Sequence, residues 1–165
     1  AERVARRLAR EKAMAVLGDR RVGHVLAADT IVVFQGRLLG KPETADEARR
    51  ALLALRGKWH RVITGVALAA GRRPRVTHAV TRVRMRDYGE AEIESYIERG
   101  EPYDKAGSYA IQDPIFQPVE RYDGCYCNVV GLPLGLVIKL ASGAGIACDS
   151  AVVLPNECAS CPLFS

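Results

Sequence analysis

Apolar and polar positions follow a helical period at the start of this chain and a strand-like pattern after it. Residues 2–17 place apolar side chains near helical spacing among charged ones, which predicts an amphipathic helix. Residues 24–34, HVLAADTIVVF, are a dense apolar and β-branched run typical of a buried strand. Gln35-Gly36 then turns the chain into a short hairpin partner, which we expect at residues 37–39.

A helix start signal stands at residues 44–47. Thr44 is placed to accept a backbone N–H, and Glu47, three residues later, is placed to reach back in a capping box. Gly57 supplies a left-handed stop after the leucines that follow. Further helices are predicted at residues 90–99, which Gly100 ends, and 133–142, where Pro133 suits a first turn.

The remaining apolar runs are short and indicate strands. They are predicted at residues 59–69, 76–86, 108–112, 116–122 and 127–130, with a turn at residues 71–74. No internal repeat or low-complexity linker divides the chain. We therefore expect one α/β domain over residues 1–142, with a mixed central sheet flanked by helices, and an irregular cysteine-containing tail over residues 143–165.

Length and composition are those of a soluble globular domain. The chain has 165 residues, of which 48% are hydrophobic and 26% charged. It contains no run of about 18 apolar residues and no signal-peptide pattern, so we expect a cytoplasmic protein without a membrane partner.

The charge favours an anionic partner. Lys and Arg number 24 against 19 Asp and Glu, which gives a net charge of +5 and suits nucleic acid, a nucleotide or a phosphate metabolite. Basic residues concentrate in residues 1–21 and 72–86, and solvated helix faces account for most of this arginine. Aromatic residues are only 6% and do not interleave with the basic runs, which disfavours a stacking platform for single strands.

All five cysteines lie in the last third of the chain, at positions 125, 127, 148, 158 and 161. An odd number so placed is not a secreted disulfide framework. Cys158 and Cys161 form a C-x-x-C that, with Cys148, offers three thiolates to zinc, but the tail holds no fourth Cys or His. We favour reduced thiols in a loosely packed tail.

Several polar residues occupy positions that suit chemistry on phosphates or bases. Asp29 lies within an apolar run, where a carboxylate needs a partner. The sequence is equally consistent with a structural and with a catalytic role for it. Lys41 and Lys105 follow turn residues and could meet phosphate oxygens, although surface lysines are the commoner case. Gln112 carries the donor and the acceptor needed to read a base edge.

Three well-known motifs are absent from the sequence: G-x-G-x-x-G, G-x-x-x-x-G-K-[ST] and H-E-x-x-H. Their absence argues against dinucleotide-binding, P-loop and zincin interpretations. His24, His60 and His78 are far apart in the sequence and are interpreted as strand residues.

Six groups of residues, taken in order, form a specific pattern. They are RLAREKA at 7–13, ADTIV at 28–32, LGKP at 39–42, LRG at 55–57 with HRVITG at 60–65, GEP at 100–102 with DKAGSYAIQ at 104–112, and NVVGLPL at 128–134. Over residues 1 to about 141 the chain resembles the Maf family of nucleoside triphosphate pyrophosphatases.

This resemblance implies an inosine-triphosphatase-like fold of the Maf/Ham1 type with a nucleotide-binding cleft. It implies hydrolysis of the α–β phosphoanhydride to a monophosphate and diphosphate, as house-cleaning of nucleotide pools. Family members use a divalent cation, Mg²⁺ or Mn²⁺, and are usually cytoplasmic homodimers. The expected partner is a nucleoside triphosphate and not nucleic acid.

The resemblance also assigns roles to individual residues. Asp29 would be the proton acceptor or a metal-linked carboxylate, and Lys12 and Lys41 would neutralise phosphate charge. Thr30 and Gln112 match positions associated with base choice in the dTTP/UTP subfamily. The branch that acts on methylated guanine has Gln and Glu there. A carboxamide can meet the acceptor–donor–acceptor edge of uracil and thymine, so we expect a pyrimidine preference, modified pyrimidines included.

The chain departs from the family pattern at its start. Family members begin with a strand and loop of the form S-x-S-x-R-R, followed by an acidic residue near the metal, and this chain starts at Ala1 beyond both. It is either a fragment or an impaired enzyme, and we expect a fragment, because losing a core strand exposes a sheet edge. Two other functions stay open: a non-catalytic regulator of septum formation in cell division, and a basic nucleic-acid-binding module.

Overall fold

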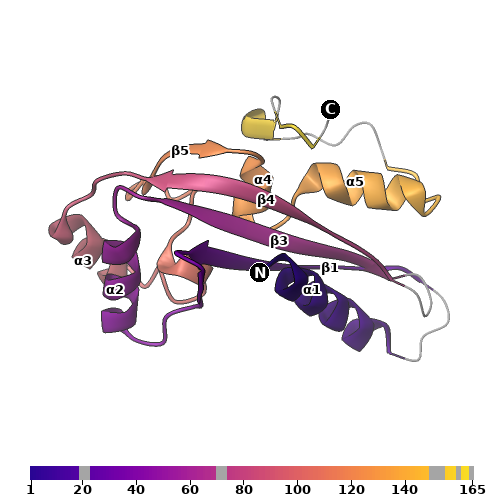
Figure 1. Ribbon diagram of the computed structural model, residues 1–165, viewed down its shortest axis with the longest axis horizontal. Helices are drawn as coiled ribbons and strands as arrows, with labels where there is room; N and C mark the ends of the chain where they lie inside the picture. The colour runs from indigo at the N-terminus through magenta and orange to yellow at the C-terminus, as the bar shows by residue number, and fades with distance from the viewer. Residues whose placement is uncertain (19–22, 70–73, 149–154, 159–160, 164–165) are drawn as a thin grey trace. The chain divides into compact units, whose positions relative to one another are not determined.

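The computed structural model describes residues 1–18, 23–69, 74–148, 155–158 and 161–163. Its elements are α1 (Glu2–Leu17), β1 (Val25–Phe34), β2 (Arg37–Leu39), α2 (Ala45–Leu55), β3 (Trp59–Ala69), β4 (Arg75–Met85), α3 (Glu90–Glu98), the 3₁₀ turn η1 (Ala106–Ser108), β5 (Val119–Asp123), α4 (Tyr126–Val130), α5 (Leu134–Gly143) and the 3₁₀ turn η2 (Asn156–Cys158). Figure 1 labels these five α-helices and the strands other than β2. The predictions of α1, α2, α3, α5 and the first four strands are confirmed within two residues.

Five strands form one sheet in the order β2-β1-β3-β4-β5, which confirms the α/β class. The pairs β1–β2 and β4–β5 are antiparallel. Neighbours β3 and β4 are separated by only residues 70–74, and so short a connection permits antiparallel pairing alone. The mixed sheet that we predicted is therefore not confirmed.

The chain forms two compact units, each assembled from separate segments. The first unit comprises Ala1–Thr30, Ile63–Val80 and Gly124–Ser165, and the second comprises Ile31–Val62 and Thr81–Asp123. Strands β1, β3 and β4 each contribute residues to both units. The boundary that we placed after residue 142 stays a prediction.

In the first unit, small side chains let α1 lie close against β3. Ala9 and Ala13 are fully buried with Ala67 and Ala69 of the strand. A Cβ added at Gly65 would lie only 2.2 Å from the carbonyl oxygen of Ala5, so glycine is required at this crossing. Helix α1 is therefore positioned by close backbone approach, and it carries Lys12 with it.

In the second unit, α2 begins with the predicted cap. The hydroxyl of Thr44 accepts the backbone N–H of Glu47 at 3.2 Å. The Glu47 carboxylate accepts the N–H of Glu43 at 2.8 Å, and not that of Thr44. Of these two donors, the N–H of Glu47 is one of the four that a helix start leaves without an intrahelical partner, whereas that of Glu43 precedes the helix. The cap is therefore a variant of the predicted box.

An aromatic core lies beside α3 in the second unit. The ring of Phe116 packs on Tyr88 and Tyr96, with ring centroids 4.9 and 4.5 Å away. The Tyr88 hydroxyl donates to the carbonyl oxygen of Leu52 in α2 at 2.7 Å, and that of Tyr96 accepts the N–H of Ala110 at 3.1 Å. Each buried phenol thus has a polar partner, as burial requires.

Three of the predicted strands differ from the structure. Residues 108–112 form the end of η1 and a turn, because Gly107 and Ser108 adopt positive φ angles of 75° and 65° and bend the chain. Strand β5 begins at Val119, later than expected, since Gln117 has a φ of 44° and Pro118 lacks an N–H to pair. Residues 126–130 form the helix α4.

The tail also differs from expectation. Cys158 and Cys161 are buried, with 1% and 3% of their surface exposed, so the loose packing that we predicted is wrong for these residues. Cys148 is exposed. Of the predicted turn at residues 71–74, residues 71–73 lie outside the described part. None of the described helices has the length and hydropathy needed to cross a membrane.

Candidate active site

Asp29 and Lys12 form an ion pair in the first unit. Asp29 extends from β1 with 15% of its side chain exposed, and its Oδ1 contacts the Nζ of Lys12 from α1. A carboxylate in an apolar strand needs such a partner, because an unpaired buried charge is costly. The Lys12 side chain stays 58% exposed, so its ammonium can also meet an anion from solvent. The structure thus brings together two of the predicted site residues.

Thr30 takes part in a chain of three hydrogen-bonding groups. Its Oγ1 lies 2.9 Å from the Oγ1 of Thr64 on β3, and Thr64 donates to the carbonyl oxygen of Asn128 in α4, also at 2.9 Å. A hydroxyl has one proton to donate. Because the Thr64 hydroxyl donates its proton to the Asn128 carbonyl, the Thr30 hydroxyl must donate to Thr64. The Thr30 oxygen can then only accept a hydrogen bond from a further group.

Lys41 and Lys105 both lie in the second unit, in loops that are tied together. Gly40 accepts the N–H of Gly107 at 3.0 Å. Lys105 Nζ donates to the carbonyl oxygen of Glu101 at 2.7 Å and to the carboxylate of Asp104 at 2.6 Å. The hydrogen bond from Lys105 holds the pKa of Asp104 below its usual range, and the charge of Lys41 adds to this effect.

Gln112 lies in the second unit with an exposed side chain. It belongs to a turn and not to the end of a strand as predicted. The next residue fixes this turn, since the buried carboxylate of Asp113 accepts the N–H groups of Ile115 and Phe116 at 3.1 and 2.6 Å. Arg99 also pairs with Asp113, at 3.0 Å.

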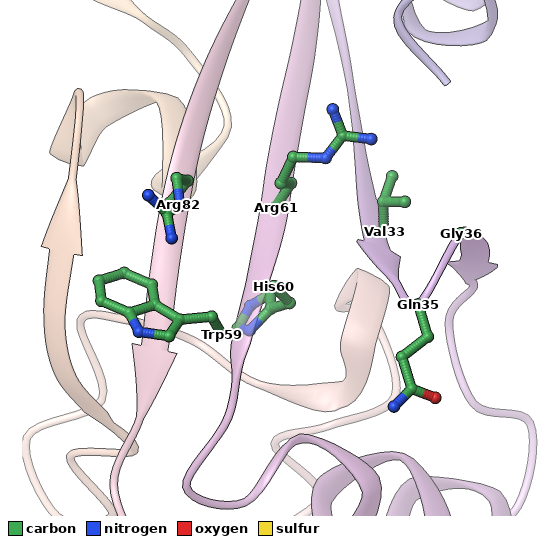
Figure 2. Close-up of a pocket in the computed structure, with 7 residues that line it drawn as sticks. All are labelled: Val33, Gln35, Gly36, Trp59, His60, Arg61 and Arg82. Carbon is green, nitrogen blue, oxygen red and sulfur yellow. The ribbon is translucent and has the colours of Figure 1, made fainter.

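A separate pocket of about 260 Å³ lies in the second unit, and none of the predicted site residues lines it. Figure 2 shows its lining residues, which are Val33, Gln35, Gly36, Trp59, His60, Arg61 and Arg82. Arg82 and Arg121 lie over the Trp59 ring, with guanidinium carbons 4.8 and 5.2 Å from its centroid. These cation–π contacts already engage the exposed aromatic surface of the tryptophan.

The described carboxylates do not form a preassembled metal cluster. In the part of the chain that the structure describes, no three His, Cys, Asp or Glu side chains are placed to hold a metal ion together. Mg²⁺ is nevertheless held in many phosphate-transfer sites by one or two carboxylates, with substrate phosphates and water completing the shell. Asp29 alone, partly exposed, fits that mode of binding.

Comparison with known protein families shows the family to which the chain belongs. A family model described as Maf-like protein matches residues 1–144, most of the chain and all of the predicted site residues. The chain belongs to the Maf family.

Curated relatives of this Maf-family chain carry an enzyme name. A protein of Thermomicrobium roseum named dTTP/UTP pyrophosphatase is 57% identical over 164 residues, which cover 98% of this chain and 75% of that protein. A protein of the same name from Hahella chejuensis is 48% identical, covering 85% of this chain and 71% of its own. One from Halalkalibacterium halodurans is 46% identical, covering 84% and 73%.

Sequence reasoning did not single out Thr64 and Asn128. Both are fully buried, and together they fix the hydroxyl of Thr30. Thr64 is the hydroxyl residue of HRVITG, and Asn128 opens NVVGLPL, so both lie within segments that carried the family resemblance. A polar side chain within an apolar strand was the available signal, because a buried hydroxyl must find a partner.

Proposed function

We propose that this Maf-family chain is a nucleoside triphosphate pyrophosphatase that hydrolyses dTTP and UTP to the monophosphate and diphosphate. The observation that carries the proposal is the relative of Thermomicrobium roseum, which bears that name and is 57% identical over 98% of this chain. The ion pair of Lys12 and Asp29 supports it, since it combines a cation and a carboxylate of the kinds the reaction needs. We do not retain the regulator and nucleic-acid-binding alternatives.

Asp29 is proposed as the proton acceptor for the attacking water. Attack on a phosphoanhydride develops negative charge on the phosphate oxygens, so positioning and charge neutralisation dominate the catalysis. Lys12 holds the Asp29 carboxylate and is exposed enough to turn its charge to a phosphate. The water gives its proton to Asp29, its oxygen bonds to the α-phosphorus, and diphosphate leaves.

A divalent cation, Mg²⁺ or Mn²⁺, is proposed as the cofactor, with Asp29 as its protein ligand. Such an ion supplies further neutralisation of the phosphate charge. The partly exposed carboxylate suits an ion that completes its shell with phosphate oxygens and water.

Lys41 and Lys105 are proposed to contact the phosphates. The hydrogen bond between Gly40 and Gly107 links their loops within the second unit. Lys105 is held by Glu101 and Asp104 in this structure, so it would exchange a carboxylate for a phosphate when the nucleotide binds.

Thr30 and Gln112 are proposed to select the base. Thr30, whose proton is committed to Thr64, offers an acceptor that suits the N3–H of uracil or thymine. Gln112, in the second unit, has an exposed carboxamide with both a donor and an acceptor, the groups that a pyrimidine edge pairs with. A guanine edge, which is rich in donors, would prefer a carboxylate at such a position.

The decisive assay follows diphosphate release from dTTP, UTP, dCTP and GTP with Mg²⁺. We expect release from dTTP and UTP, and a fall of about 10²- to 10⁴-fold in Asp29→Asn, as for loss of a general base. Asp87→Asn is the matched control, since that side chain is 90% exposed and pairs only loosely with Arg56 at 3.7 Å. The assay is run on this chain and on a longer chain carrying the S-x-S-x-R-R segment. No release from either would refute the proposal.

Further expectations for this protein are a cytoplasmic location, a homodimeric assembly and a Maf/Ham1-type fold with a nucleotide cleft. Light scattering on the protein as it leaves a size-exclusion column measures the oligomeric state. A monomer at micromolar concentration would contradict the dimer.

A further inference from the structure

Four buried cysteines from two distant segments meet in the first unit. Cys125 and Cys127 lie at the start of α4, and Cys158 and Cys161 lie in and just after η2. Between 1% and 5% of each residue's surface is exposed. We refer to these four residues as the thiol cluster. The fifth cysteine, Cys148, is exposed and lies outside it.

The thiol cluster consists of two hydrogen-bonded pairs, each joining α4 to the tail. Cys125 is paired with Cys161, and Cys127 with Cys158. Burial raises the pKa of Cys125 and of Cys127 to about 12, and the thiol partners add to the shift. All four cysteines are reduced in this structure, so no covalent bond between them joins the tail to α4.

The surroundings of the thiol cluster resemble those of a closed metal centre. Tyr126, Leu134 and Leu163 pack against it and shield it from water. The backbone N–H of Asn128 donates to the sulfur of Cys125, a contact that favours a thiolate. The spacings C-x-C and C-x-x-C provide two short ligand pairs, and four cysteines are the full set of a structural zinc site.

We propose that the thiol cluster binds one Zn²⁺ ion, which fastens the C-terminal tail to α4. Four thiols bind the ion as thiolates and release four protons, with no change of oxidation state. As placed, no three of the cluster's side chains surround an ion, so binding must draw the two pairs together. Rotation about one Cα–Cβ bond moves each sulfur, and zinc needs sulfur atoms about 3.8 Å apart, given Zn–S bonds of about 2.3 Å.

The contacts of the tail in the first unit show which elements a bound zinc ion would hold together. A Cβ added at Gly135 in α5 would lie 2.6 Å from the carbonyl oxygen of Leu163, so the tail lies directly against this helix. Helix α4 also presents the Asn128 carbonyl that fixes Thr64. A zinc ion would therefore brace the helix that orders the Thr64–Thr30 hydrogen bond.

The test measures zinc in the protein purified under reducing conditions without added metal. Mass spectrometry of the metal content should give one zinc per chain in the wild type and in Cys148→Ser, the matched control. Cys158→Ser and Cys161→Ser should each lose the zinc and unfold at least about 5 °C lower. Retention of one zinc per chain in both of these variants would overturn the proposal.

A second measurement avoids the risk that the variants do not fold. Wild-type protein stripped of metal and refilled with Co²⁺ should show thiolate-to-cobalt charge-transfer bands and the visible bands of a tetrahedral site. Four of the five thiols should be protected from a thiol reagent by Zn²⁺ and exposed by a chelator. A wild type that holds no zinc and shows no such bands would overturn the proposal, whether its cluster is found as free thiols or as two disulfides.

Discussion

His60 is expected to make the free energy of unfolding depend on pH below neutrality. Its side chain is buried in β3, with 4% of the residue exposed, and its Nε2 lies 2.7 Å from the hydroxyl of Tyr109. Protonation would place a second N–H on the ring, and Nδ1 has no hydrogen-bond partner among the described residues. Burial accordingly lowers the pKa of His60 from its ordinary value of 6.5 to about 4.

The sign and size of the effect follow from these two values. Between about pH 6.5 and pH 4 the unfolded chain binds a proton at His60 that the folded chain does not, so the free energy of unfolding falls as the pH falls. At about 1.36 kcal/mol for each pKa unit, the full loss is about 3 kcal/mol by pH 4. That is a large share of the stability of an ordinary domain.

The assay is urea unfolding of the wild type and His60→Gln from about pH 7 to pH 4. The variant, which cannot take up the proton, should be the less stable protein at pH 7 and should lose about 3 kcal/mol less on acidification. His24→Gln is the control, because it replaces a histidine that is exposed instead of buried. Carboxylates contribute equally to all three proteins. Parallel curves for the wild type and His60→Gln would refute the reasoning.

Two further predictions concern stability. Thr64→Val removes the hydrogen bond from the Thr64 hydroxyl to the buried Asn128 carbonyl and should lower the free energy of unfolding by about 1–3 kcal/mol. Thr64→Ser keeps a hydroxyl and should retain most of that free energy, so equal urea midpoints for Thr64→Val and the wild type would contradict the prediction. Gly65→Ala drives a Cβ against the Ala5 carbonyl and should cost about 1–3 kcal/mol or more, while Gly40→Ala, with open space around it, should change the midpoint little.

Local patterns predicted the elements whose causes are local. The cap at Thr44 and the apolar period after it define α2 without help from distant residues. Residues 108–112 show the opposite case. Gly107 packs on Val32, since a Cβ added at Gly107 would lie 3.0 Å from a methyl carbon of Val32. The N–H of Gly107 also donates to the carbonyl oxygen of Gly40. These distant contacts impose a bend that the apolar run does not predict.

In the candidate site, too, some features follow from local sequence and others from distant contacts. The motif containing Lys12 and the one containing Asp29 are both readable in the sequence, and the charge of a strand carboxylate explains why they meet. The thiol cluster was not predicted, because Cys125 and Cys127 lie about 30 residues before the C-x-x-C and residues 127–130 were interpreted as a strand. The two pairs meet in the folded protein, where the tail packs against α4.

Asp29 and Thr30 are neighbours in β1, yet they depend on different parts of the first unit. Successive side chains of a strand point to opposite faces. Accordingly Asp29 meets Lys12 of α1, while Thr30 meets Thr64 and, through it, α4. The tail contacts α4, the helix whose Asn128 carbonyl accepts from Thr64. Loosening the tail should therefore disturb Thr30, the residue proposed for base choice, before it disturbs Asp29, the proposed proton acceptor. Discrimination among nucleotides should then decline before the rate of hydrolysis of the preferred nucleotide does.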